Sequence, residues 1–366
     1  MSYREELAQN ITDAEGLFEY LGEELSPEDR KKYADILDRF PMSVPKYYLS
    51  LIDKSDPCDP IRKMCLPSVG ETDLSGSFDT SGEKENTVIR GLQHKYKKTA
   101  LVLSTNRCAM YCRHCFRKRL VGVTAEEIGR EFEETVSYVK RHEEISNVLI
   151  SGGDAFLCSN AKIERYLQEF SKIEHLDLIR FGTRTPAVLP SRIYGDLELC
   201  GLLKKYGEKK QIYVVTHFNH PNEITDEAKR AIKCLLEADV IVKNQTVLLK
   251  GVNDSAETLS ALLGGLTRIG VIPYYVFQCR PVSGVKNQFQ VPLAEGHKII
   301  SGARKRLNGQ GKCFRYIMST VKGKIEILGQ GEDGRMLFAF HQAKYAKDEN
   351  RIFSQQLTAK QSWITA

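Results

Sequence analysis

The sequence lacks any run of about eighteen apolar residues, the length that a membrane-spanning helix needs. It also lacks a block of like charges that would mark a nucleic-acid or membrane surface, with 53 basic and 47 acidic residues. The first residues have neither the apolar core of a signal peptide nor the acid-free composition of a transit peptide. These absences predict a cytoplasmic protein that binds neither nucleic acid nor membranes. Its 366 residues, 42% of them hydrophobic, are enough to fill a large core.

A disulfide scaffold is also excluded, because ten cysteines are too few for one in a chain of this length. Three of them lie close together in the run Cys108-Ala-Met-Tyr-Cys112-Arg-His-Cys115. The other seven have no common spacing, and we expect ordinary thiols there: Cys58, Cys65, Cys158, Cys200, Cys234, Cys279 and Cys313.

The cysteine triplet predicts a metal centre with one open position. Structural zinc sites usually have four protein ligands, and [4Fe–4S] clusters that only transfer electrons use four cysteines. No fourth cysteine lies near this triplet. Three cysteines would hold three irons of such a cluster and leave the fourth iron free to bind another molecule. A zinc site completed by His114 is the alternative that the spacing leaves open.

The hydrophobic pattern predicts an α/β fold. Residues 1 to about 50 have helical patterning, with Ser26 as an N-cap before Pro27, and residues 55–85 form an irregular connection. Six apolar runs follow, beginning at Ala100, Asn147, Leu178, Gln211, Val240 and Tyr274. Helical stretches at about 124–143, 160–173, 190–206, 225–237 and 256–269 separate them. Such alternation is typical of a parallel sheet, either open and doubly wound or an incomplete barrel.

A polar segment follows five of the six apolar runs. Active sites of parallel α/β sheets lie at the carboxyl ends of the strands, where these segments are expected. The segments are Thr105-Asn-Arg-Cys108, Ser151-Gly-Gly-Asp154, Gly182-Thr-Arg-Thr-Pro186, Thr216-His-Phe-Asn-His220 and Gln278-Cys-Arg280. We therefore expect them to surround one site together with the cysteine triplet.

The triplet followed by Phe116 resembles the signature of the radical S-adenosylmethionine (SAM) superfamily. The flanking segments resemble the lysine 2,3-aminomutase family, including its glutamate 2,3-aminomutase branch, over roughly residues 85 to 345. The segments that carry this resemblance are His94-Lys-Tyr, Thr105 to Arg119, Ser151-Gly-Gly-Asp-Ala, Thr183-Arg-Thr-Pro-Ala-Val-Leu-Pro, Thr216-His-Phe-Asn-His-Pro-Asn-Glu, Asn244 to Asp254, and Pro273-Tyr-Tyr-Val-Phe-Gln-Cys.

The resemblance implies a partial (β/α)6 TIM-type barrel with an N-terminal helical layer and a short C-terminal extension that contains strands. We expect the helical layer and its connection at 1–90, the barrel at 91–300 and the extension at 301–366. Family members often form homo-oligomers, although the tail that helps them associate is shorter here.

The resemblance also implies an isomerase that uses a [4Fe–4S] cluster, SAM and pyridoxal 5′-phosphate (PLP). A reductant such as flavodoxin or ferredoxin would deliver an electron to the cluster, which cleaves SAM to a 5′-deoxyadenosyl radical. The radical takes hydrogen from the β-carbon of a small amino acid bound to PLP, and the amino group then moves from C2 to C3. Cys108, Cys112 and Cys115 would hold the cluster.

Several residues are expected to contact SAM. Gly152 and Gly153 let the backbone approach a ligand closely, and the Asp154 carboxylate would accept the ammonium group of SAM. His217 and His220 lie in the matching segment after the fourth run. Asn244 and Gln245 are amides in an apolar strand and must find partners. A strand-terminal turn for the Gly-Gly-Asp element and a core hydrogen-bond network for the amides remain alternatives.

Lys324 is the candidate for the covalent bond to PLP, with Lys322 as its substitute. A lysine needs desolvation or neighbouring cations to be nucleophilic at neutral pH. The flanking Ile-Glu-Ile alternation predicts a short strand that enters the protein, whereas a surface hairpin is the alternative. Where the family has two arginines for the PLP phosphate, this sequence has Lys95 and Thr99, so phosphate binding rests on fewer cations.

Two arginines bear on the substrate. Arg117 matches the family's arginine for the substrate α-carboxylate, for which a guanidinium is suited. Arg280 stands where lysine-specific members have an aspartate, and Ile317 to Thr320 contains no acid. A cation facing the substrate side chain favours an acidic amino acid such as glutamate.

Other interpretations stay open. Arg280 could instead bind the PLP phosphate, and the substrate could be lysine, free or protein-borne, or the chemistry another radical SAM reaction. A non-catalytic iron–sulfur or zinc protein would use the triplet, but it would have no use for Gly152 to Asp154 or for Lys324.

Overall fold

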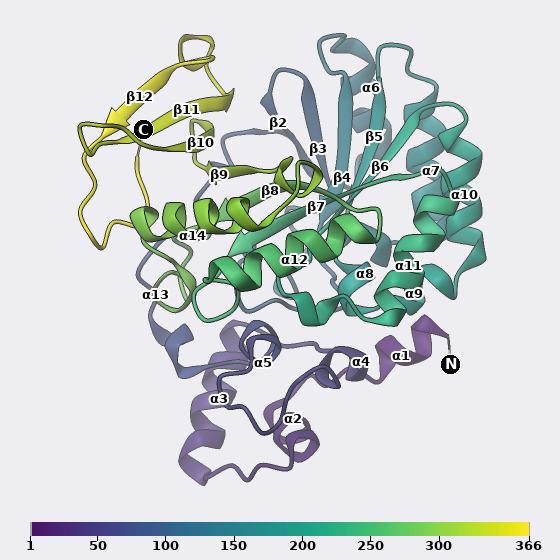
Figure 1. The fold of residues 1–366 in the computed structure, drawn as a ribbon. Coiled ribbons are helices and arrows are strands. Elements are labelled where there is room, and N and C mark those ends of the chain that lie inside the picture. Colours follow the sequence, from purple (N-terminus) through teal and green to yellow (C-terminus); the bar gives the residue numbers. More distant parts are fainter. Residues whose placement is uncertain (1, 366) are drawn as a thin grey trace.

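A twelve-stranded sheet in sequence order, β1 to β12, is the framework of the computed structural model, which describes residues 2–365 (Figure 1). Strands β3 to β9 run parallel, and the flanking strands pair antiparallel. No ladder joins β1 to β12 in the described chain, so the sheet is open, as in a partial barrel. The strands are β1 (Thr87–Ile89), β2 (Leu92–Tyr96), β3 (Thr99–Thr105), β4 (Asn147–Gly152), β5 (Leu178–Gly182), β6 (Gln211–Thr216), β7 (Ile241–Leu248), β8 (Ile272–Gln278), β9 (Arg315–Ser319), β10 (Gly323–Gln330), β11 (Met336–Ala343) and β12 (Ile352–Gln355).

The six predicted strands are confirmed as β3 to β8, and all six are parallel to one another. Most buried apolar residues of β3 to β6 pack into the main core, whereas Leu248 of β7 and Val276 of β8 belong to a second core. The prediction missed a seventh parallel strand, β9, which pairs with β8. The helix before it, at residues 293–306, was not predicted either, so the alternation of strands and helices could not be followed beyond β8.

The helices that cross between the strands cover the outside of the sheet (Figure 1). Four of the five predicted stretches contain one helix each, namely α6 (Phe132–Arg141), α7 (Asn160–Ser171), α11 (Asp226–Glu237) and α12 (Ala256–Arg268). The single helix expected at 190–206 is wrong, because the chain forms α8 (Thr185–Val188), α9 (Ser191–Tyr194) and α10 (Leu197–Gly207). Pro190 and Gly195 separate them, and the Asp196 carboxylate caps α10 by accepting from Leu199 N at 3.0 Å.

The N-terminal helices lie together at one end of the molecule, below the other helices in this view (Figure 1). As predicted, Ser26 caps the helix that starts at Pro27, since its Oγ accepts from Asp29 N at 3.1 Å. The layer holds the cysteine segment through its backbone, because Arg113 N donates to the Met64 carbonyl at 2.9 Å. Its helices are α1 (Tyr3–Ala8), α2 (Ala14–Leu21), α3 (Pro27–Arg39), α4 (Lys46–Leu49) and α5 (Pro60–Cys65), followed by η1 (Val69–Thr72).

The C-terminal strands β10 to β12 continue the sheet and share a second core with α12 and α14 (Leu293–Arg306). The predicted strand at Lys324 is therefore confirmed as β10. Helix α14 runs through residue 300, where the sequence predicts a boundary, and the division into three parts stays a prediction.

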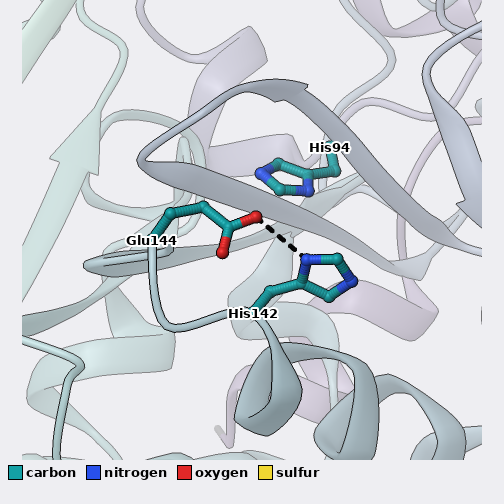
Figure 2. Close-up of side chains that lie close together, drawn as sticks. All are labelled: His94, His142 and Glu144. Atoms are coloured by element: carbon teal, nitrogen blue, oxygen red, sulfur yellow. Dashed lines mark hydrogen bonds and ion pairs between the residues drawn. The ribbon is translucent and has the colours of Figure 1, made fainter.

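Two further features concern the outside of the molecule. Among the described residues, no helix combines the length and apolar character needed to cross a membrane. Beside β2, the side chain of His94 lies close to those of His142 and Glu144, which follow α6 (Figure 2).

Candidate active site

One cavity of about 340 Å³ brings most of the predicted residues together. It lies within the open barrel and reaches the carboxyl ends of the parallel strands, as expected for this type of sheet. His220 and Asn244 do not line it. The predicted residues that do are Lys95, Cys108, Cys112, Cys115, Arg117, Gly152, Gly153, Asp154, His217, Gln245, Arg280 and Lys324.

The three cysteines of the triplet are free thiols that face this cavity. Burial raises the pKa of Cys115 to about 11, with Cys112 adding repulsion, and burial also raises the pKa of Cys108. Two donors point at the sulfurs, because Arg184 Nη1 lies 2.6 Å from Cys112 Sγ and Arg117 N lies 3.3 Å from Cys115 Sγ. Three cavity-facing thiols with hydrogen-bond donors to their sulfurs fit an iron–sulfur cluster that keeps one iron open.

The two glycines at the end of β4 allow its backbone to lie very close to the backbone at Thr105 and Arg107. Gly152 has φ +122°, and a Cβ there would lie 2.3 Å from the Thr105 carbonyl oxygen. A Cβ on Gly153 would lie 2.3 Å from the Arg107 carbonyl oxygen. The glycines therefore let the end of β4 pack against the start of the cysteine segment.

The Asp154 carboxylate is held by protein donors at the cavity wall. It accepts hydrogen bonds from Thr183 Oγ1 at 2.5 Å, Arg184 N at 2.7 Å and Phe156 N at 3.0 Å. Burial nevertheless raises its pKa, against these hydrogen bonds. Asp154 thus fixes the loops after β4 and β5, and its contact with an ammonium group stays a prediction.

Two buried histidines face the cavity with unused ring nitrogens. His217 Nε2 and both ring nitrogens of His114 have no hydrogen-bond partner, and the ring centroids lie 5.7 Å apart. Burial lowers the pKa of His217 to about 3, with Arg184 adding repulsion, and burial also lowers that of His114 well below its ordinary value. Both rings are therefore neutral at physiological pH and free to bond a polar ligand.

His220 and Asn244 have structural roles instead. His220 Nδ1 accepts from Asn222 N at 3.2 Å and so caps the short turn after β6. The Asn244 amide binds both backbone groups of Phe218, accepting from its N–H at 2.7 Å and donating to its carbonyl at 3.1 Å. Asn244 thus belongs to a hydrogen-bond network in the core, which was the alternative interpretation. Its bonds to Phe218 orient the loop that carries His217.

Lys324 projects from β10 into the cavity. Its Nζ lies 2.9 Å from Gln342 Oε1 and 4.1 Å from the centre of the Tyr96 ring. Burial, followed by the charges of Arg180, Lys95 and Arg280, lowers its pKa well below the ordinary value. The lowered pKa increases the neutral, nucleophilic fraction of the amine, and an amine of this kind suits a bond to the aldehyde of PLP.

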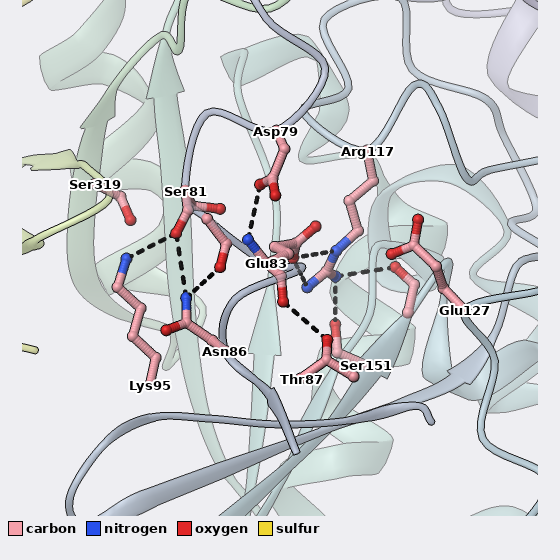
Figure 3. Close-up of polar contacts among 12 residues, drawn as sticks. Asp79, Ser81, Glu83, Asn86, Thr87, Lys95, Arg117, Glu127, Ser151 and Ser319 are labelled. Atoms are coloured by element: carbon pink, nitrogen blue, oxygen red, sulfur yellow. Dashed lines mark hydrogen bonds and ion pairs between the residues drawn. The ribbon is translucent and has the colours of Figure 1, made fainter. Parts of the chain in front are cut away.

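Lys95 and Arg280 form a cationic wall beside Lys324. Lys95 Nζ donates to the Ser81 carbonyl at 3.1 Å (Figure 3) and to the Thr320 carbonyl at 2.5 Å. Burial, Arg280 and Lys344 lower its pKa to about 7. Arg280 lines the cavity and donates to Ser81 Oγ at 2.8 Å and to Ser319 Oγ at 3.1 Å, and its contact with a substrate side chain stays a prediction.

Arg117 already has an acidic partner. Its Nη2 lies 2.8 Å from Glu83 Oε1, its Nε bonds the same oxygen at 2.9 Å, and Nη1 donates to Gly152 O at 3.1 Å (Figure 3). Burial raises the pKa of Glu83, but Arg117 and Arg119 outweigh it and hold that pKa at about 2. A substrate carboxylate at Arg117 would share the guanidinium with Glu83.

Two further arginines belong to the cavity wall: Arg184, which lies in a segment expected at the site but was given no role, and Arg180, which the sequence analysis missed. Arg184 links the cluster site to the core, with Nη2 2.7 Å from the buried Glu223 carboxylate. Arg180 lies in the middle of β5, and its buried Nε has no hydrogen-bond partner. Burial lowers the pKa of Arg180. The signal was present, because an arginine inside an apolar strand must either find a partner or bind a ligand.

Known proteins with similar sequences share most of this chain. A family model described as the radical SAM superfamily matches residues 102–263. The L-lysine 2,3-aminomutase of Fusobacterium nucleatum is 40% identical over 299 residues, 78% of this chain and 69% of that protein. The L-lysine 2,3-aminomutase of Acetoanaerobium sticklandii is 39% identical over 307 residues, which are 83% of this chain and 72% of that protein. The glutamate 2,3-aminomutase of Clostridioides difficile is 35% identical over 324 residues, which are 88% of this chain and 75% of that protein. The similarity therefore extends far beyond the cysteine segment.

Proposed function

The chain belongs to the radical SAM superfamily and, within it, to the family of lysine and glutamate 2,3-aminomutases, and from this premise we propose a PLP-dependent aminomutase that acts on an acidic amino acid. One observation carries the dependence on PLP. Lys324 reaches the same cavity as Cys108, Cys112 and Cys115, with an amine whose pKa is strongly lowered. A lysine in that condition is suited to bond an aldehyde.

The bound cofactors would supply the hydrogen-abstracting radical and the electron-withdrawing ring that the migration needs. The protein's own part is to hold and orient. Cys108, Cys112 and Cys115 would bind the cluster, and the neutral rings of His114 and His217 offer polar contacts to SAM beside it. The wall formed by the connection at 79–87 and by β10 would keep water away from the reacting atoms.

The charge of the cavity supports an acidic substrate. Lys95, Arg180, Arg280 and Lys324 face it, and all four have a lowered pKa because burial disfavours their charged forms. The carboxylates of the lining, Glu83 and Asp154, are already bonded to protein donors. Anions are therefore favoured, both as the PLP phosphate at Lys95 and Arg180 and as a side-chain carboxylate at Arg280. A lysine substrate would place a further cation against Arg280.

The reaction is tested anaerobically after reconstitution with iron, sulfide and PLP. With SAM and dithionite present, glutamate, aspartate and lysine are offered separately, and β-amino acids are measured by mass spectrometry. We expect β-glutamate. Formation of β-lysine would support the aminomutase reaction but contradict the proposed role of Arg280 in selecting an acidic substrate. Formation of 5′-deoxyadenosine without any β-amino acid from the three substrates would contradict the proposed substrate class.

The role of Lys324 is tested independently of turnover. Lys324→Ala should abolish the visible absorption of bound PLP, whereas Lys322→Ala, which changes an exposed lysine two residues away, should keep it. Persistence of the absorption band in Lys324→Ala would show that another lysine binds the cofactor. We also propose that flavodoxin or ferredoxin donates the electron, which a cluster-reduction assay with flavodoxin would test. Self-association of the chain is a separate proposal, which light scattering would test.

A further inference from the structure

We propose that His94, His142 and Glu144 bind one divalent transition-metal ion, with Zn²⁺ as the best match, on the outside of the barrel (Figure 2). Each residue offers one ligand atom, and these three atoms lie within 4.8 Å of one another. The proposal does not depend on the aminomutase reaction, because none of the three residues lines the catalytic cavity.

Two separate elements bring the ligands together. His94 lies on β2, and side chains alternate along a strand, so His94 faces away from the side on which Lys95 enters the cavity. His142 ends α6, and Glu144 follows two residues later. His142 Nδ1 and Glu144 Oε1 are 2.9 Å apart, and the two histidine ring centroids are 5.7 Å apart.

One neighbouring side chain orients both histidines. The Tyr138 ring stacks on the His142 ring with 4.0 Å between centroids, and the Tyr138 hydroxyl lies 3.0 Å from His94 Nδ1. The other nitrogen of His94 lies 3.2 Å from the Lys97 carbonyl oxygen. Fixed rings with an outer hydrogen-bond partner are typical of metal-binding histidines.

The donor set selects the class of metal. Two imidazoles and one carboxylate match the three protein ligands of open zinc sites, in which water takes the fourth position. Mg²⁺ and Ca²⁺ prefer oxygen ligands throughout, so they should bind poorly. All three side chains are partly exposed, which leaves an entry path from solvent. Bound metal would clamp β2, the strand that carries Lys95, to the end of α6.

The test uses the anaerobic holoenzyme, in which the iron–sulfur cluster occupies the three cysteines. Zn²⁺ is titrated in competition with a chromophoric chelator, and the unfolding temperature is measured with and without Zn²⁺. We expect one Zn²⁺ per chain and a higher unfolding temperature in its presence. His142→Ala, His94→Gln and Glu144→Gln should each weaken binding at least about tenfold, and Tyr138→Phe should weaken it less.

His175→Ala is the matched control. His175 also packs against α6, with Nε2 3.0 Å from the Val139 carbonyl oxygen, but it is not part of the site. The His175→Ala variant should bind Zn²⁺ with the affinity of the wild type. Substituting Co²⁺ distinguishes the ligands, since a thiolate charge-transfer band would place the metal on cysteine and overturn the proposal. Unchanged affinity in His142→Ala and Glu144→Gln, or no Zn²⁺ bound at all, would reduce the three residues to a surface hydrogen-bond network.

Discussion

At the scale of residues, Arg180 adds a guanidinium to the cavity wall. Its Nε is buried without a hydrogen-bond partner, and burial disfavours its charged form, which destabilises the folded state. Arg180→Gln should therefore raise the unfolding temperature of the cofactor-free protein. The same change should weaken PLP binding by about tenfold or more, because a charged hydrogen bond to the phosphate is lost. Thermal unfolding and an absorbance titration with PLP measure the two effects.

The opposite signs of these effects separate an anion-binding residue from a structural one. Arg165→Gln changes an exposed arginine on α7 and should leave both quantities as they are. If Arg180→Gln destabilises the cofactor-free protein and leaves PLP affinity unchanged, Arg180 supports the fold and does not bind the phosphate.

Lys95 makes stability depend on pH. Burial, Arg280 and Lys344 hold its folded-state pKa at about 7, whereas the ordinary value is 10.5. Between these values the unfolded chain keeps the proton and the folded chain has lost it, so the free energy of unfolding rises with pH. Lys95→Met should flatten this rise between about pH 6 and pH 9, as measured by urea unfolding.

The pH comparison needs a matched lysine, because Lys118 has a pKa lowered to about 8 by burial and contributes a rise of the same sign. Lys97→Met changes an exposed lysine on the same hairpin and should keep the wild-type slope. Equal slopes in Lys95→Met and Lys97→Met would mean that Lys95 is protonated in the folded protein.

At the scale of elements, η1 links the N-terminal layer to the cysteine segment through buried ion pairs. Its Glu71 is buried and forms ion pairs with Arg113 and Lys118, with 2.5 Å between Glu71 Oε2 and Arg113 Nη2. Glu71→Gln would leave two buried cations without an ionised partner, and we expect a loss of about 3–5 kcal/mol in the free energy of unfolding. Urea unfolding measures it, with the exposed Glu28→Gln on α3 as the control. A loss no larger than that of the control would contradict the proposed link.

The elements also show what the sequence could predict. Long apolar runs such as Gln211 to Thr216 defined β3 to β8, because strands buried on both faces need continuous apolar side chains. The break at Gly195 was missed because local turns decide the ends of short helices. Strand β9 was missed because no helix was recognised before it, although the five-residue β5, which has one on each side, was predicted.

The site shows the same division. Strand order predicted that the cysteines, Gly152 to Asp154 and Arg280 would meet. Pairing between side chains could not be predicted, because it depends on distances across the fold. Asn244 therefore bonds to Phe218 and not into the cavity, and Glu83, distant in sequence, pairs with Arg117.

At the scale of the whole molecule, three distant parts of the chain close one side of the cavity. Lys95 on β2 donates to the carbonyl of Ser81 (Figure 3) and to that of Thr320. Arg280 donates to the hydroxyls of Ser81 and Ser319. The connection at 79–87 and the turn between β9 and β10 are thus held by the same two cations. An anion bound to these cations would tighten both segments at once.

Hydrogen exchange tests this coupling. Addition of PLP should slow amide exchange in 79–87 and in 315–325 together, because opening either segment would expose the shared cations and their ligand. Helices α2 and α3 do not line the cavity and should exchange at unchanged rates. Lys95→Met should reduce the protection in both segments, since Lys95 contacts both. Protection of only one segment, or equal slowing of α2 and α3, would mean that the wall does not respond to the ligand as a unit.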